Sequence, residues 1–166
     1  LENELKNDVD EIYSDKLGSF ISKKGNQGLK VMLAAHMDEV GFIVKRIDEN
    51  GYIYFQPVGG WWPQVLLAQQ VIITTYKGKE IFGFIGCKPP HVLKAEKRKE
   101  MVQIEDMFID LGVSSKQEVI DLGIQIGDMI TPKTEYRKMN NDKYLFGKAM
   151  DNRIGCAIVV DVMKRL

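Results

Sequence analysis

Between residues 40 and 131 the chain is built of short β-type runs that are separated by turn residues. Asn50-Gly51 stands between two apolar runs, and this dipeptide in that setting is the strongest short-range signal for a hairpin. Lys77-Gly78 divides a second pair of runs. The pattern therefore predicts a mainly β segment, with strands at Val40–Ile47, Tyr52–Val58, Val71–Tyr76, Ile81–Ile85, Met107–Leu111 and Asp128–Thr131.

The residues before this β segment have another pattern. Lys30–Ala35 is an almost continuous apolar run, which is typical of a strand that is buried on both faces of a sheet. Further upstream, the β-type runs Val9–Ser14 and Leu17–Ser22 flank a turn at Asp15-Lys16.

Two segments have helical signals. The first, Ser114–Leu122, begins with two serines and stops at Gly123, and Ser115 and Glu118 have the spacing of a capping box. The second, Asp151–Leu166, carries apolar residues at every fourth position, namely Ile154, Ile158 and Val162.

Charge and cysteine content exclude several function classes. The 23 Lys and Arg residues balance 23 Asp and Glu residues, whereas a nucleic-acid-binding protein normally has a basic excess. Apolar runs all fall short of the roughly 20 residues that span a bilayer. We therefore expect neither nucleic acid nor a membrane as a partner. We expect Cys87 and Cys156 to be reduced and buried, which favours a cytoplasmic location.

The first of the two histidines is a candidate ligand. His36 directly follows the apolar run Lys30–Ala35, and the carboxyl end of a strand is where α/β sheets usually bind ligands. Asp38 lies two positions on, so in an extended chain both side chains point the same way. This pair is either part of a metal site or a hydrogen-bonded histidine beside a turn aspartate.

Asp151 is open to two interpretations as well. It immediately precedes the second helical segment, where aspartate is a common N-cap. Its carboxylate has two oxygens, so it is also suited to bridging two cations.

Other chemistry-bearing residues have weaker signals. His91 follows Pro89-Pro90, and a turn or interface histidine is the preferred interpretation. Trp61-Trp62 is a concentrated aromatic patch, which is either core or, if exposed, a surface for a partner.

Several separated motifs occur in one order along the chain. They are Asp15-Lys16-Leu17-Gly18, Ala35-His36-Met37-Asp38-Glu39-Val40-Gly41, Gly83–His91, Asp110–Ser115, Gly127-Asp128 and Ala149-Met150-Asp151-Asn152-Arg153. In this combination the chain resembles the glutamyl-aminopeptidase and tetrahedral-aminopeptidase (TET-like) family of dinuclear metallopeptidases. The resemblance extends from about Val9 to Leu166.

The resemblance implies an α/β fold in which a zinc-peptidase-like domain is interrupted by an inserted β-barrel-like domain. Residues 1–40 would form the first part of the metallopeptidase domain, and residues 144–166 would return to it without completing it. Residues 41–143 would form the insert, which serves oligomerisation or substrate access. Such an insert explains how His36 and Asp151 reach one site.

The resemblance also implies roles for three residues. His36 would bind one divalent cation, Asp151 would bridge two, and Asp38 would orient His36. The cofactors would be two zinc or cobalt ions that activate water, the substrates short peptides that lose N-terminal residues, and the assembly a dimer that builds into a dodecamer.

The sequence lacks other parts that the resemblance implies. It has no Glu-Glu pair to supply the general base, and no histidine follows His91. A catalytic zinc normally has three protein ligands, so two are too few. We therefore expect these 166 residues to be part of a longer enzyme and to be inactive alone.

Two alternatives to an aminopeptidase stay open. One is a non-catalytic oligomerisation module, formed by the insert and its Trp61-Trp62 patch. The other is an endoglucanase-like glycoside hydrolase, a label that relatives of this family have carried. Glycoside hydrolysis needs two carboxylates about 5–10 Å apart, for which Asp38 and Asp151 are the candidates.

Overall fold

A computed structural model describes residues 1–166, and by their contacts these divide into two compact units. One unit is residues 40–148, and the other combines residues 1–39 with residues 149–166. The sequence predicts an insert at residues 41–143, close to the first of these units. The function of each part stays a prediction.

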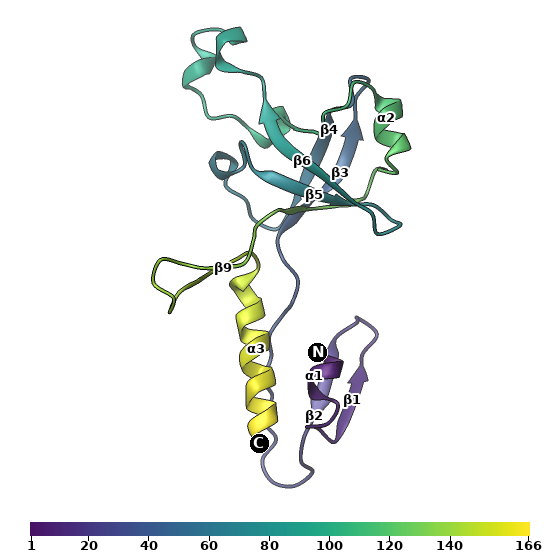
Figure 1. The fold of residues 1–166 in the computed structure, drawn as a ribbon, viewed down its shortest axis with the longest axis vertical. Helices are drawn as coiled ribbons and strands as arrows, with labels where there is room; N and C mark the ends of the chain where they lie inside the picture. Colours follow the sequence, from purple (N-terminus) through teal and green to yellow (C-terminus); the bar gives the residue numbers. More distant parts are fainter. The chain divides into compact units, whose positions relative to one another are not determined.

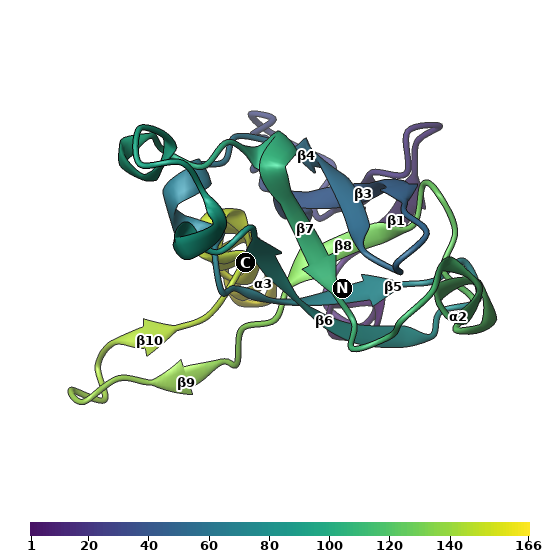
Figure 2. The same cartoon turned by 90° about the horizontal axis from the view of Figure 1, so that it is seen from above.

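A closed six-stranded barrel forms the centre of the unit 40–148 (Figures 1 and 2). The strand order is β3-β4-β7-β6-β5-β8, and all neighbours are antiparallel. The predicted α/β fold with an inserted barrel is confirmed, and each strand predicted in this region is found within two residues. The strands are β3 (Gly41–Ile47), β4 (Ile53–Val58), β5 (Gln70–Thr74), β6 (Glu80–Cys87), β7 (Met107–Asp110) and β8 (Met129–Pro132).

The first hairpin is closed by the turn that the sequence predicts. The Asp48 carboxylate accepts hydrogen bonds from the backbone N–H groups of Asn50, at 3.0 Å, and Tyr52, at 2.9 Å. Gly51 has a φ of +86°, a conformation that side chains rarely adopt. A Cβ at this position would also lie 3.0 Å from the backbone oxygen of Ser115. Glycine is therefore required here for two independent reasons.

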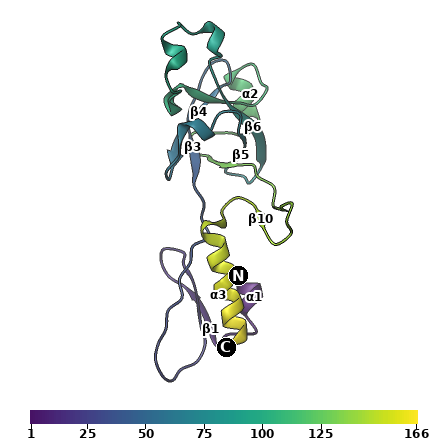
Figure 3. The same cartoon turned by 90° about the vertical axis from the view of Figure 1, so that its left-hand side faces the viewer.

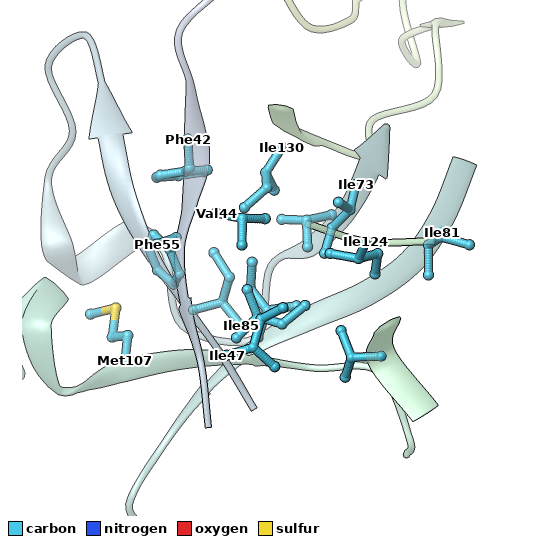
Figure 4. Packing of buried hydrophobic residues seen from close by; sticks show 14 of the residues in the cluster. Phe42, Val44, Ile47, Phe55, Ile73, Ile81, Ile85, Met107, Ile124 and Ile130 are labelled. Atoms are coloured by element: carbon cyan, nitrogen blue, oxygen red, sulfur yellow. The ribbon is translucent and has the colours of Figure 1, made fainter. Parts of the chain in front are cut away.

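The barrel interior is filled by apolar side chains (Figure 4). Phe42 and Val44 alternate inward along β3, and a register shift between Val44 and Arg46 then brings Ile47 into the core instead of Arg46. Such a bulge re-aims the side chains that follow it. The buried cluster comprises Phe42, Val44, Ile47, Ile53, Phe55, Leu66, Val71, Ile73, Ile81, Ile85, Met107, Ile109, Val119, Ile124 and Ile130.

Helix α2 (Lys116–Asp121) contributes Val119 to this core and begins as the sequence predicts. Ser115 is its N-cap, with Oγ accepting from the backbone N–H of Glu118 at 3.3 Å. The Glu118 carboxylate in turn accepts from the backbone N–H of Ser114 at 3.2 Å. The predicted helix and its cap are confirmed.

The two tryptophans have different environments. The Trp61 ring stacks on Phe42 with centroids 4.8 Å apart, and its Nε1 donates to the Gly41 carbonyl at 3.0 Å. Trp62 is 74% exposed. Of the Trp61-Trp62 patch, Trp61 therefore packs against the core and Trp62 lies on the surface.

The connections of this unit carry only short elements. Four 3-10 turns are present, η1 (Pro63–Val65), η2 (Pro90–Val92), η3 (Lys97–Lys99) and η4 (Ile104–Asp106). Strands β9 (Arg137–Lys138) and β10 (Leu145–Phe146) pair in a separate two-stranded ladder, which the sequence analysis did not predict. Two residues per strand are too few for an alternation signal.

The second unit contains α1 (Glu2–Leu5), β1 (Glu11–Ser14), β2 (Phe20–Lys23) and α3 (Met150–Arg165). Strands β1 and β2 form a hairpin across the predicted turn, where Asp15 accepts from the backbone N–H groups of Ser19 and Leu17. These hydrogen bonds, the one from Ser19 foremost, hold the pKa of the Asp15 carboxyl below its ordinary value.

Helices α1 and α3 contact each other within this unit (Figure 3). The Lys164 ammonium lies 2.7 Å from the Glu4 carboxylate. Its hydrogen bond lowers the pKa of Glu4. None of the helices combines the length and the apolar character that crossing a membrane requires.

The predicted buried strand at Lys30–Ala35 is wrong. These residues form no strand, and Val31 and Met32 are 76% and 88% exposed. A strand needs neighbours to satisfy its backbone groups, and no strand within the 166 residues pairs with this run. On α3, which is confirmed as a helix, Ile154 and Ile158 of the predicted apolar stripe are likewise exposed.

We predict that Ile85→Ala destabilises the barrel by about 2–5 kcal/mol, because Ile85 is fully buried and its truncation leaves a cavity. Ile126→Ala is the matched control, since Ile126 is 69% exposed, and should cost less than about 0.5 kcal/mol. Urea unfolding followed by tryptophan fluorescence measures both, because both tryptophans lie in this unit. Equal losses for the two variants would contradict the described core.

Candidate metal centre

The three residues that the sequence singles out lie together in the unit formed by residues 1–39 and 149–166. His36 and Asp38 belong to a segment without helix or strand, and Asp151 lies in the first turn of α3. Two stretches that are far apart in the sequence thus meet here.

The imidazole of His36 lies between two carboxylates. Its Nδ1 is 2.9 Å from Oδ1 of Asp38, and its Nε2 is 3.5 Å from Oδ1 of Asp151. The Asp151 side chain is 97% exposed and that of His36 is 55% exposed. Both side chains are therefore accessible to solvent in these 166 residues.

This arrangement fits a divalent cation held by His36 and Asp151. Metal bonds of about 2.0–2.2 Å that meet at the tetrahedral angle place two ligand atoms roughly 3.3–3.6 Å apart. The observed 3.5 Å lies in that range. A carboxylate on Nδ1, such as Asp38, keeps the proton there and leaves the Nε2 lone pair for a metal. The metal-ligand roles themselves stay predictions.

The chain holds no complete cluster of metal-ligating side chains. No group of three or more His, Cys, Asp and Glu side chains in it could hold an ion. His36 and Asp151 would provide two ligand atoms, and the second oxygen of Asp151 is the only further donor that this pair could offer to a second cation.

The interpretation of Asp151 as a helix N-cap is wrong. The N-cap is Ala149, which has a φ of +57°, and no side chain caps the helix there. Asp151 and Asn152 have non-helical backbone angles, and the peptide bond between them is cis. With the backbone in this conformation, the Asp151 carboxylate faces His36 instead of the backbone N–H groups of α3.

Two residues that the sequence analysis gave no role in the site touch the histidine segment from α3. Arg153 Nε donates to the Met37 carbonyl at 2.9 Å, and its other arm lies 3.7 Å from the Glu39 carboxylate. Cys156 Sγ donates to the His36 carbonyl at 3.3 Å. Arg153 belongs to the motif Ala149–Arg153, but no rule of sequence spacing indicates which backbone carbonyl its side chain will contact.

The remaining candidates lie elsewhere in the chain. His91 is an exposed residue of η2 in the unit 40–148, in keeping with its interpretation as a turn histidine. Both cysteines are free thiols, as expected, but they are half-buried instead of buried. Unlike His91, Cys156 lies beside the candidate site, where its thiol contacts the His36 carbonyl.

Comparison with known proteins gives a consistent result. Residues 18–166 match the family described as M42 glutamyl aminopeptidase. The chain is 44% identical over 162 residues to FrvX of Escherichia coli, covering 98% of this chain and 45% of that protein. It is 36% identical over 152 residues to the glutamyl aminopeptidase of Lactococcus lactis, covering 90% and 43%. The chain thus spans less than half the length of these relatives.

Solved structures share the fold. A TET aminopeptidase from the marine sediment archaeon Thaumarchaeota archaeon SCGC AB-539-E09 has a TM-score of 0.94 at 41% identity, over 99% of this chain and 46% of that chain. The Pyrococcus horikoshii TET1 peptidase, described as able to assemble into a tetrahedron or a large octahedral shell, has a TM-score of 0.85 at 30% identity, over 99% and 48%. A Thermotoga maritima protein named as an endoglucanase has a TM-score of 0.79 at 33% identity, over 99% and 47%.

We predict that neutral His36 carries its proton on Nδ1, because the Asp38 carboxylate accepts a hydrogen bond there. Long-range ¹H–¹⁵N NMR of the metal-free protein distinguishes the tautomers. Asp38→Ala should shift His36 toward the Nε2-protonated form, while the exposed His91 serves as an internal control that does not change. An Nδ1-protonated His36 that survives Asp38→Ala would contradict this arrangement.

Proposed function

The chain belongs to the M42 glutamyl aminopeptidase family, and from this we propose that it supplies one part of the active site of a metal-dependent aminopeptidase. The substrates would be short peptides that lose N-terminal residues. One observation carries the proposal: His36 Nε2 lies 3.5 Å from Asp151 Oδ1 while Asp38 occupies Nδ1.

Each of the three residues has a defined task in this proposal. His36 would hold one cation through Nε2, and Asp151 would bridge that cation and a second one. Asp38 holds the Nδ1 proton and fixes the ring orientation. Two zinc or cobalt ions held there would supply Lewis-acid chemistry, which polarises a scissile carbonyl and lowers the pKa of bound water.

The proposed activity belongs to the whole protein. The family relatives are about twice as long as this chain, which covers 45% of FrvX. Within this chain, no group of three or more His, Cys, Asp and Glu side chains could hold an ion, and the sequence has no Glu-Glu pair to supply a general base. We therefore propose that the general base and the further ligands come from outside these 166 residues, and that the chain alone is inactive.

A glycoside hydrolase is less well supported, although one similar structure is named an endoglucanase. That chemistry needs a sugar between its two carboxyl groups. Here the His36 imidazole lies between Asp38 and Asp151 and contacts both. The carboxylates are therefore arranged around a histidine ligand and not across a cleft.

We also propose that the unit 40–148 takes part in assembly, with dimers that build into a dodecamer. Similarity to the TET1 peptidase, which forms large shells, supports this, and so does the exposed Trp62. Tryptophan is enriched at protein interfaces. A cytoplasmic location is proposed as well, because both cysteines are free thiols.

We predict that His36→Ala and Asp151→Asn, made in the whole protein, each lower kcat/KM on aminoacyl anilides at least about 100-fold, because each removes a direct metal ligand. Bound zinc or cobalt, measured by elemental analysis after dialysis, should fall in parallel. His91→Ala is the control and should leave both quantities unchanged. Full metal content and activity in His36→Ala would refute the proposed site.

The isolated 166-residue chain should show no turnover at saturating zinc or cobalt, since it lacks the general base. Gel filtration of the same sample tests the assembly proposal, which expects a defined oligomer larger than the 18.9 kDa monomer. Turnover by a chain of verified mass would contradict the first expectation, and a monomeric elution volume the second.

A further inference from the structure

We propose that Arg153 is a positioning residue that sets the separation between His36 and Asp151. This inference rests on the proposed metal site. The two proposed ligands lie on separate stretches of chain, around residue 36 and around residue 151. Arg153 connects these stretches through its side chain.

The histidine segment contacts α3 at several points. His36, Met37 and Asp38 lie outside every helix and strand of these 166 residues. Met37 stands between the proposed ligand and its orienting carboxylate. Its carbonyl receives the Arg153 Nε–H at 2.9 Å, so this one bond fixes the backbone at the centre of the His36–Asp38 pair.

The same guanidinium holds the segment at a second point. Its second arm lies 3.7 Å from the Glu39 carboxylate, whose side chain is only 15% exposed. Cys156, three residues further along α3, contacts the His36 carbonyl at 3.3 Å. Consecutive residues of the histidine segment are thus held by side chains of the helix that also presents Asp151.

Arginine is suited to this task and lysine is not. The planar guanidinium uses Nε on one acceptor and a terminal nitrogen on another at the same time. A lysine ammonium can reach one of the two, and a glutamine at position 153 is too short for the pair. Loss of the two Arg153 contacts lets the histidine segment move. The 3.5 Å separation of His36 Nε2 and Asp151 Oδ1 then changes as well.

The test uses cobalt(II) binding to the whole protein. Arg153→Gln removes both contacts, and Arg153→Lys keeps the charge in case Arg153→Gln does not fold. Arg165→Gln is the matched control, because Arg165 lies on the same helix, is 77% exposed and pairs only with Asp161 at 2.8 Å. Three quantities are measured: the cobalt Kd, the visible absorption spectrum at saturating cobalt, and the Tm of the metal-free protein.

We expect the Arg153 variants to bind cobalt about 10–100-fold more weakly, as is usual when a residue that orients a metal ligand is lost. Their saturated spectra should differ from the wild-type spectrum, because the ligand geometry has changed, whereas Arg165→Gln should match wild type in both. Wild-type affinity and spectrum in the Arg153 variants would overturn the inference. A weaker Kd with an unchanged spectrum and a lower apo Tm would overturn it too, since it would mark a general structural role.

The experiment distinguishes a failure of the proposed metal site from a failure of the positioning role of Arg153. If cobalt binding by the wild-type protein does not depend on His36, the proposed metal site is wrong and this inference falls with it. If binding depends on His36 but not on Arg153, only the positioning role is wrong.

Discussion

Buried backbone N–H and C=O groups need hydrogen-bond partners, and the two units of this chain differ in how their strands find them. In the unit 40–148 the sheet closes on itself, so each of the six strands has two neighbours and no edge stays open. The apolar side chains of that sheet then face one enclosed core. Every strand of the barrel therefore finds its hydrogen-bond partners within this unit.

The unit of residues 1–39 and 149–166 has no such closure. Its one sheet is the β1–β2 hairpin, its apolar run at Lys30–Ala35 is exposed, and α3 leaves Ile154 and Ile158 uncovered. These features agree with a chain that spans less than half the length of its relatives. The candidate metal centre lies in this unit, with His36 and Asp151 as its two proposed ligands.

Within these 166 residues, side-chain contacts connect the histidine segment to α3. Asp38 Oδ1 lies 2.9 Å from Nδ1 of His36, and the side chains of Arg153 and Cys156 donate to the carbonyls of Met37 and His36. The first turn of α3 carries Asp151. The Asp38 contact lies within the histidine segment, whereas the Arg153 and Cys156 contacts join that segment to α3. Nε2 of His36 and Oδ1 of Asp151 lie 3.5 Å apart, a separation that one cation could span.

The sequence alone determined the features that depend on neighbouring residues. The Asn50-Gly51 turn, the Ser115 cap and the barrel strands were all predictable, because their signals lie within a few positions of one another. The family and the pairing of His36 with Asp38 were accessible in the same way. Motif order and an i, i+2 spacing are both properties of the printed sequence.

Only the tertiary structure decided the rest. Lys30–Ala35 has the composition of a buried strand, but burial depends on partners that composition does not specify. Asp151 has the position of a cap, but its backbone departs from helical angles and turns its carboxylate to His36. Arg153 reaches Met37 across 116 positions of sequence. Contacts over that separation follow from how the chain packs, and no local pattern encodes them.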